Sequence, residues 1–276
     1  MYFVKTDRNT IIKCERHRIK IPTIGWVKLK QKGYIPADSE KYIIKSGNVS
    51  KKANRYYVSV LVESNEFQIQ DNNQNQGIGI DLGIKDFAIC SNGIIYENIN
   101  KTDTIRKLEK RKRHLQRKLS NKYELNRQGK NYIKTQNIIK VEKEINRLNF
   151  RLYNVRHNYL HQVTTDIIDR KPKFIVLEDL NVNGMLKNKH LSKSIQEQSW
   201  YEFRTILEYK CKMNNIELRM VDRFYPSSKM CNQCGNIKKD LKLKDRVYHC
   251  DCCNNEIDRD LNASINLFNA TEYKIA

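Results

Sequence analysis

Two pairs of cysteines near the C-terminal end constrain this chain more than any other feature of its sequence. Cys231 and Cys234 form one Cys-x-x-Cys pair, and Cys250 and Cys253 form a second, with fifteen residues between the pairs. Two such knuckles can hold four thiolates at the corners of a tetrahedron, which suits zinc and leaves no open position for catalysis. Gly235, directly after the first pair, suits the tight turn of a zinc knuckle. The spacing therefore predicts a structural zinc ribbon.

The alternative to a zinc site is a set of buried cysteines without a metal. Cys252 offers a shifted pair with Cys250, but the spacing is wrong for a knuckle, and we interpret Cys252 as a bystander. The remaining cysteines are scattered, which favours a metal site in a reducing compartment over a disulfide framework. The first residues lack the apolar segment of a signal peptide, and the chain has no run of about 18 apolar residues. We therefore expect a cytoplasmic protein that does not span a membrane.

The charge of the chain indicates a polyanionic partner. Its 52 Lys and Arg residues exceed its 31 Asp and Glu residues, which gives a formal net charge of +21 and an isoelectric point near 9.6. Nucleic acid is the commonest partner for such a surplus, and a membrane surface is the rival. The length of 276 residues allows one large domain or two modest ones.

The first 70 residues alternate apolar and polar positions and are rich in aromatic and β-branched residues. This pattern predicts strands at residues 25–30 and 55–62, and a strand at 41–45 that pairs with one of them. We expect part of a small β-barrel or sheet with lysines on its wet face. Residues 68–76, with the sequence QIQDNNQNQ, lack an apolar period and predict a linker at the first domain boundary.

An α/β pattern begins at Gly77. A short buried strand at 78–81 is followed by two apolar runs around Asn92-Gly93, a strong hairpin signal. We expect a mixed sheet with helices. The further predicted elements are helices at 101–119 and 133–169, a strand at 173–177, a helix at 195–214, a strand at 216–221 and a last helix at 261–268.

The two long helices predict an antiparallel hairpin. The second helix carries apolar residues at 3-4 spacing over three heptads, namely Ile138, Val141, Ile145, Leu148, Leu152, Val155 and Tyr159. The first helix contains a continuous basic run from Lys110 to Arg113. Such a run either contacts nucleic acid or is a solvated helix face, and the sequence leaves both interpretations open.

Three acidic positions stand where they would reach one edge of the sheet. Asp81 follows the apolar Ile78 and Ile80, Glu178 closes the strongest strand, and Asp260 opens the last helix beside Asp258. Carboxylates that hold two divalent ions are what phosphodiester hydrolysis requires, and oxygen ligands select magnesium or manganese. Each acid also has a simpler interpretation: a turn residue, a solvated strand end, or the N-cap of the last helix. Spacing alone does not decide between these interpretations.

Four ordered motifs, over roughly residues 15–270, resemble the transposon-encoded TnpB (OrfB) family, whose members are related to the type V CRISPR effectors. The motifs are Gly79-Ile80-Asp81-Leu82-Gly83, Leu177-Glu178-Asp179-Leu180, Tyr225-Pro226-Ser227-Ser228-Lys229 before the cysteine pairs, and Asp258-Arg259-Asp260-Leu261-Asn262-Ala263-Ser264-Ile265-Asn266. The resemblance implies an RNase H-like (RuvC) nuclease domain with a zinc ribbon inserted before its last helix. It also implies RNA-guided cleavage of a DNA target, with a guide RNA transcribed from the end of the element.

The resemblance assigns roles to residues of this chain. The acidic triad falls on Asp81, Glu178 and Asp260, with Asp260 preferred because the second acid of the Asp-x-Asp pair is the ligand in this family. The zinc ligands fall on Cys231, Cys234, Cys250 and Cys253. The implied domains are a partial wedge (β-barrel) domain at 1–70 and a nuclease domain at 71–276, which contains the helical hairpin at 101–169 and the zinc ribbon at 226–257.

The chain departs from the family at its start. Family members normally carry a further N-terminal stretch that completes the wedge barrel and inserts a helical recognition lobe. The sequence therefore predicts intact chemistry with impaired targeting. Although family members are often described as transposases, the implied chemistry is DNA cleavage rather than strand transfer.

The predicted mechanism is two-metal hydrolysis of one DNA strand, with Mg²⁺ or Mn²⁺ held by the triad and Zn²⁺ in the ribbon. Arg223, Lys229 and Arg246 are candidate phosphate contacts. Arg259 either orients a carboxylate or phosphate or lies at the surface. Two rivals stay open: a non-catalytic nucleic-acid-binding accessory or repressor module, and a zinc-ribbon protein of the translation apparatus, which would leave the acidic motifs unused.

Overall fold

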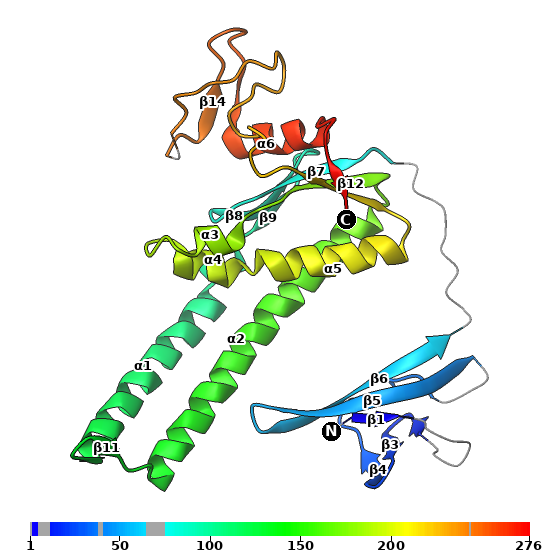
Figure 1. Ribbon diagram of the computed structural model, residues 1–276, viewed down its shortest axis with the longest axis vertical. Helices are drawn as coiled ribbons and strands as arrows, with labels where there is room; N and C mark the ends of the chain where they lie inside the picture. The colour runs from blue at the N-terminus through cyan, green and yellow to red at the C-terminus, as the bar shows by residue number, and fades with distance from the viewer. Residues whose placement is uncertain (1, 5–11, 38–40, 65–74, 243) are drawn as a thin grey trace. The chain divides into compact units, whose positions relative to one another are not determined.

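The computed structural model of the chain describes residues 2–4, 12–37, 41–64, 75–242 and 244–276 (Figure 1). The chain separates into two compact units. The first comprises Met1–Gln68 and Lys112–Arg151, and the second comprises Ile69–Arg111 and Leu152–Ala276. Residues 68–74 of the predicted linker at 68–76 lie outside the described residues. The two units are described separately below.

Two small antiparallel sheets form the β-rich part of the first unit. Strand β1 (Tyr2–Val4) pairs with β5 (Tyr42–Lys52), which forms a hairpin with β6 (Arg55–Ser64) through Ala53 and Asn54, both at positive φ. The strand at 41–45 was predicted to pair with one of the strands at 25–30 and 55–62, and it pairs with the second. The second sheet consists of β2 (Lys13–Glu15), β3 (Arg18–Ile21) and β4 (Gly25–Lys28) in that order. Apolar residues from both sheets share one buried cluster: Phe3, Ile12, Cys14, Ile19, Ile21 and Ile44.

The predicted helical hairpin consists of α1 (Asp103–Leu125) and α2 (Gln136–Asp169). A two-stranded ribbon joins them, formed by β10 (Arg127–Gln128) and β11 (Asn131–Tyr132) around Gly129 at positive φ. The Tyr123 hydroxyl near the end of α1 donates a hydrogen bond to Glu142 near the start of α2, as an antiparallel pair requires. Of the predicted apolar stripe on α2, the residues from Ile138 to Leu152 are buried.

A six-stranded mixed sheet is the centre of the second unit, in the order β16-β13-β12-β7-β8-β9. Its three central strands β13, β12 and β7 are parallel, and the others are antiparallel to their neighbours. The predicted Asn92-Gly93 turn connects β8 and β9, with Gly93 at a φ of +84°. The strands are β7 (Ile78–Leu82), β8 (Asp86–Cys90), β9 (Ile95–Glu97), β12 (Phe174–Glu178), β13 (Glu217–Val221) and β16 (Lys274–Ile275).

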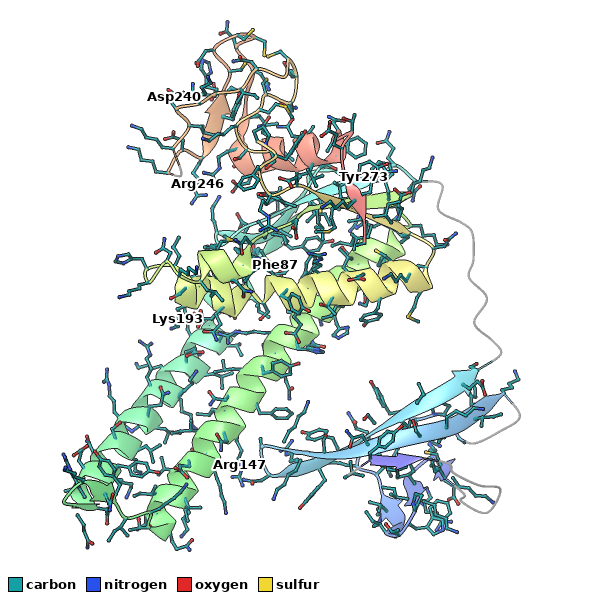
Figure 2. All side chains as sticks on the ribbon, viewed as in Figure 1. Phe87, Arg147, Lys193, Asp240, Arg246 and Tyr273 are labelled. Atoms are coloured by element: carbon teal, nitrogen blue, oxygen red, sulfur yellow. The ribbon has the colours of Figure 1, made fainter. Side chains whose placement is uncertain are left out.

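Helices cover both faces of this sheet, and α5 (Trp200–Met213) and α6 (Arg259–Phe268) lie on opposite faces (Figure 1). Alternate residues of a strand point to opposite faces. Ile175 and Leu177 pack in the main core with the end of α2 and with α5, whereas Val176 packs with Leu267 of α6. Phe87 lies in the main core and packs edge-on against Tyr159 and Phe203, with ring centroids 5.7 and 5.2 Å apart (Figure 2).

The single helix predicted at residues 195–214 is wrong, because two helices meet there. Helix α4 (Ser192–Gln198) ends at Ser199, whose φ of 54° is left-handed, and α5 then begins at Trp200. The break turns the chain so that Ile195 and Trp200 both enter the core. Local sequence gives no signal for it, since no Pro or Gly lies in this stretch. A short helix, α3 (Val182–Met185), and the 3-10 turn η1 (Ile99–Lys101) complete the unit.

The cysteine region forms a small lobe directly before α6. Its hairpin pairs β14 (Val247–His249) with β15 (Glu256–Asp258), and Tyr248 is fully buried between the cysteines. Strand β15 runs without a linker into α6, so the lobe and the helix share a backbone junction. Among the described residues, no helix is both long enough and apolar enough to cross a membrane.

Candidate active site and metal centre

Asp81 and Glu178 lie at the same edge of the central sheet. Strands β7 and β12 are parallel neighbours, and Ile80 is paired with Leu177. Asp81 and Glu178 each follow these paired residues, so they come next to one another where the two strands end. By strand alternation, both carboxylates share the face of Gly79 and Val176, which is the face covered by α6.

The third acid, Asp260, reaches this edge because α6 lies directly on β7. A Cβ atom at Gly79 would come within 2.2 Å of the carbonyl oxygen of Ser264, so only glycine allows this approach. From Ser264 back to Asp260 the helix advances about 6 Å, and from Gly79 to Asp81 the strand advances about 6.6 Å. Asp260, in the first turn of α6, therefore comes level with Asp81.

The electrostatics of the edge reflect this proximity. Burial, together with the charges of Asp260 and Glu178, raises the pKa of Asp81 to about 7, while Arg259 opposes them. Burial, with a smaller contribution from Asp179, likewise raises the pKa of Glu178 to about 7. Shifts of this direction mark carboxyl groups that are costly to ionise without a nearby cation. The three carboxylates, however, do not form a group close enough to share one metal ion. Within the described ranges, only the four cysteines form such a group.

The two acids of the Asp-x-Asp pair have different surroundings. The Asp258 side chain is exposed and caps α6, since its Oδ1 accepts from the backbone N–H groups of Asp260 and Leu261 at 3.0 and 3.1 Å. The Asp260 carboxylate is only 15% exposed and accepts two hydrogen bonds from Arg259, at 2.7 and 2.9 Å. Thus Asp258 is the N-cap, and Arg259 orients a carboxylate.

Two of the three predicted phosphate contacts lie beside the acids. The Arg246 guanidinium is 3.7 Å from an Asp260 carboxylate oxygen, and the Arg223 guanidinium donates to Asp179 at 2.8 Å. Figure 2 shows Arg246 on the cysteine lobe, on the side that faces the sheet. Lys229 instead lies within the lobe, with its ammonium group 3.5 Å from the carbonyl oxygen of Lys239.

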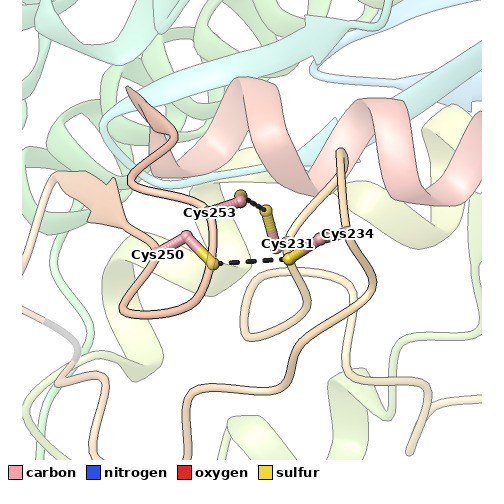
Figure 3. Close-up of side chains that lie close together, drawn as sticks. All are labelled: Cys231, Cys234, Cys250 and Cys253. Carbon is pink, nitrogen blue, oxygen red and sulfur yellow. Dashed lines mark hydrogen bonds between the residues drawn. The ribbon is translucent and has the colours of Figure 1, made fainter.

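The four predicted zinc ligands converge in the cysteine lobe (Figure 3). All four sulfur atoms lie within 4.8 Å of one another; Cys231 and Cys253 are 3.6 Å apart, and Cys234 and Cys250 are 3.5 Å apart. Cys252, predicted to be a bystander, is exposed and outside this group. Four thiols at these distances are the donor set of a closed tetrahedral site, so the cluster could hold a zinc ion.

Backbone groups favour thiolate formation within this cluster. The N–H groups of Cys253 and Cys252 lower the pKa of Cys250 to about 6. At Cys234, a backbone hydrogen bond with Asn236 acts to lower the pKa, but hydrogen bonds with other thiols of the cluster raise it to about 12. These opposite shifts are those of thiols that share protons, and a cation at their centre would remove the conflict.

Sequence reasoning missed the asparagines that attach α6 to the cysteine lobe. Asn262 and Asn266 are almost fully buried, and both side-chain amides donate to the carbonyl oxygen of Met230, at 2.7 and 2.6 Å. The backbone N–H of Asn232 donates in turn to Asn262 at 3.0 Å. The available signal was two asparagines at i and i+4 on the apolar side of a helix, where amides are rare unless hydrogen-bonded.

Asp179 and Arg204 were missed as well. The Asp179 carboxylate, directly after Glu178, accepts from Arg204 at 3.0 Å and from Arg223 at 2.8 Å. One acid thereby positions two guanidinium groups beside the edge. Arg204 comes from α5, and no spacing in the sequence relates it to the acidic motifs.

Comparison with known proteins identifies relatives of the chain. The family model OrfB_IS605, described as "Probable transposase", matches residues 57–189, and the model "Cas12f1-like, TNB domain" matches residues 200–267. The "Putative RNA-guided DNA endonuclease" of Streptomyces pristinaespiralis is 33% identical over 219 residues, which cover 79% of this chain and 50% of that protein. The chain is a relative of the TnpB (OrfB) proteins. The resemblance predicted from the four sequence motifs is thereby confirmed.

A second relative and a solved structure are similar to this TnpB relative along most of its length. The "Putative RNA-guided DNA endonuclease InsQ" of Escherichia coli (strain K12) is 28% identical over 271 residues, which cover 93% of this chain and 62% of that protein. The chain thus spans about half to three-fifths of the length of these two relatives. The solved structure titled "Cryo-EM structure of the Cas12f1-sgRNA-target DNA complex" aligns with a TM-score of 0.56 at 18% identity, over 84% of this chain and 46% of that one. This likeness shows the mixed α/β fold.

Proposed function

We propose that the chain is a metal-dependent DNA endonuclease guided by RNA, in which the sheet edge with Asp81, Glu178 and Asp260 is the cleavage site. The observation that carries the proposal is the convergence of these three acids from β7, β12 and α6 on one face of the sheet. The names of the two curated relatives support the reaction class, and the net charge of +21 supports a nucleic-acid partner.

The second unit would then be an RNase H-like (RuvC) nuclease domain. Its support is a sheet of three antiparallel strands joined to parallel strands, with the acids at the carboxyl ends of β7 and β12. The carboxylate oxygens fit Mg²⁺ or Mn²⁺, and the raised pKa of Asp81 indicates that a cation would stabilise its ionised form. In this proposal Asp81, Glu178 and Asp260 would together hold the ions.

When bound, such ions would supply the activation of water and the stabilisation of the leaving oxygen. The residues of the chain orient the participants. Arg259 holds the Asp260 carboxylate in place, and Asp179 holds Arg204 and Arg223 at the edge, where guanidinium groups can bind the phosphates of the substrate strand. Asp81 is partly buried, and electrostatic interactions are stronger in such a setting than in water.

The cysteine cluster would hold a structural Zn²⁺ through Cys231, Cys234, Cys250 and Cys253. Four thiolates saturate the ion, so its role is architectural. The lobe is attached to α6 by Asn262 and by the junction between β15 and α6. Zinc binding would therefore help to fix the position of Asp260.

The proposed partners are a DNA target and a guide RNA from the transposon end, and the proposed compartment is the cytoplasm. The β-rich sheets within residues 1–70 would form the partial wedge domain, and residues 71–276 the nuclease domain. Support for the nucleic-acid partners comes from a related fold, solved as a "Cas12f1-sgRNA-target DNA complex". Sequencing of the RNA that copurifies with the chain would test the guide: a defined transposon-end transcript is expected, and random RNA would contradict it.

The decisive experiment compares cleavage of labelled single- and double-stranded DNA by the wild-type chain and by Asp81→Ala, with Mg²⁺ and the copurified RNA. We expect cleavage by the wild type and a loss of at least about a hundredfold in the variant, as for other residues on which the transition-state charge depends. Equal cutting by both proteins would refute the site. RNA binding without cleavage under any divalent ion would favour the non-catalytic module.

A further inference from the structure

Phe224 is an apolar side chain in an unusual position. Its ring is 86% exposed, which is the highest exposure among the large hydrophobic side chains that the structure describes. An exposed aromatic ring forgoes the free energy that its burial would provide. A single exposed apolar residue needs no explanation by itself, but its location and its fixed backbone do indicate a role.

The backbone around Phe224 is held by a compact turn. The carboxylate of Asp222 accepts from the Phe224 N–H at 2.9 Å, and the Asp222 carbonyl oxygen accepts from the Tyr225 N–H at 3.0 Å. The Tyr225 hydroxyl is anchored in turn on the Asn266 carbonyl oxygen of α6, at 3.1 Å. The ring is thus displayed from an ordered support.

This turn lies at the acidic edge. Val221, the last residue of β13, is paired with Glu178, and its carbonyl oxygen accepts from the Asp179 N–H at 2.9 Å. Phe224 is three residues further along, so its Cα atom lies within about 11 Å of that of Val221. The intervening Arg223 is hydrogen-bonded to Asp179. An exposed aromatic ring, two positioned guanidinium groups and the three acids therefore gather at the end of the same strands.

We propose that Phe224 is a stacking platform for an unpaired base of the strand that crosses the acidic edge, with Arg223 and Arg204 on its phosphates. Exposed aromatic rings beside positive charge are how proteins hold single strands, because every base offers a π face to stack on. A paired duplex would hide its base faces from the ring. The inference rests on the proposed nuclease function and deepens it: Phe224 is a further binding residue, which holds a base of the substrate strand beside the acids without reading its identity.

The test measures binding of short single-stranded DNA that carries the fluorescent base 2-aminopurine at successive positions. The full chain with Asp81→Ala is used, so that no cutting occurs, and Phe224→Ala, Phe224→Leu and Phe224→Trp are added to it. Tyr201→Ala, which removes a 75% exposed ring of α5, is the matched control. Thermal unfolding of each variant checks that the fold is kept.

We expect 2-aminopurine to be quenched on binding in the parent and in Phe224→Trp, and this quenching to be lost in Phe224→Ala and Phe224→Leu. Affinity for the single strand should fall roughly 5- to 150-fold in Phe224→Ala, about 1–3 kcal/mol, and should be unchanged in Tyr201→Ala. Phe224→Leu separates stacking from apolar contact. If Phe224→Ala keeps both the quenching and the affinity, or if Phe224→Leu keeps the quenching, the stacking proposal is wrong.

Cleavage by the otherwise wild-type chain, measured in parallel, separates this inference from the proposed function. Cleavage that depends on Asp81, together with unchanged base quenching in Phe224→Ala, would overturn the stacking role alone. Absence of cleavage, together with base quenching that depends on Phe224, would overturn the nuclease proposal and leave a single-strand binding site.

Discussion

The side-chain amide of Asn262 donates to the carbonyl oxygen of Met230 at 2.7 Å, from inside α6 to the residue before the first cysteine of the cluster. Asn262 also accepts from the Asn232 N–H at 3.0 Å. Through these bonds, one fully buried amide connects the helix that carries Asp260 to the cysteine lobe. The acidic edge and the cysteine cluster are therefore connected through buried hydrogen bonds.

We predict that Asn262→Ala lowers the free energy of unfolding by roughly 1–3 kcal/mol, because the Asn232 N–H loses its acceptor and the Met230 carbonyl oxygen keeps only the hydrogen bond from Asn266. DNA cleavage should fall as well, since Asp260 loses its fixed position. Chemical denaturation measures the first effect and cleavage rates the second. Asn269→Ala, an exposed position at the end of the same helix, is the control and should change stability little. Full activity and stability of Asn262→Ala would contradict the linkage.

We also predict that Cys250→Ser removes the zinc, whereas Cys252→Ser, two positions away, keeps it. Cys250 belongs to the group of four sulfur atoms, and Cys252 is exposed outside it. Elemental analysis of the purified proteins should find one zinc per chain in the wild type and in Cys252→Ser. Loss of zinc in Cys252→Ser, or full zinc in Cys250→Ser, would show that the cluster is assigned wrongly.

Substitutions of Asp258 and of Asp260, at the start of α6, should have different effects on stability and on cleavage. Asp258→Ala removes the N-cap and should cost about 1 kcal/mol of stability, while Asp258→Asn, which can still cap, should cost much less. Asp260→Asn should keep stability near the wild-type value and abolish cleavage. Denaturation curves and cleavage assays on the three variants test this. An active Asp260→Asn beside an inactive Asp258→Asn would reverse the assignment.

The pKa values of Asp81 and Glu178 predict a pH dependence. Both are raised to about 7, so the folded protein favours the protonated acids. Their contribution to stability is fully present below their ordinary values near 4 and is lost as the pH rises through 7. Without divalent ions, Asp81→Asn should therefore remove part of the fall in stability of the wild type between pH 4 and 7, roughly 2–4 kcal/mol at most.

Added Mg²⁺ supplies the check on this pH dependence. At pH 8 it should raise the melting temperature of the wild type by binding the ionised acids, and it should leave Asp81→Asn unchanged. Identical pH profiles of the two proteins, with and without Mg²⁺, would contradict the raised pKa of Asp81.

Local patterns were sufficient to predict much of the fold from residue 77 onward. The buried strands around Ile80 and Val176, the Asn92-Gly93 hairpin and the helical pair were predictable because period, turn chemistry and burial agree there. The break at Ser199 was not predictable, because tertiary packing of Trp200 imposes a left-handed residue on a helical sequence. The contact of Arg204 with Asp179 also depends only on the fold.

The acidic edge was predictable in part. From the sequence pattern alone, Asp81, Glu178 and Asp260 could each have had a simpler role, as a turn residue, a solvated strand end or a helix N-cap. The resemblance to a family, and not their spacing, identified them as candidate metal ligands. The feature that brings Asp260 level with Asp81 is the absence of a side chain at Gly79, which allows α6 to touch β7. A glycine between two isoleucines indicates such a close approach only after the partner helix is known.

The proposed nuclease site requires Asp81, Glu178 and Asp260 to form one pocket for paired divalent cations. Titration of the zinc-loaded chain with Mn²⁺, followed by electron paramagnetic resonance, tests it most directly, because two Mn²⁺ ions about 4 Å apart give a magnetically coupled spectrum. We predict two coupled Mn²⁺ ions per wild-type chain and loss of the coupled signal in Asp81→Ala. A wild type that binds no coupled pair, or an Asp81→Ala variant with the same spectrum, would show that the three acids do not form such a pocket.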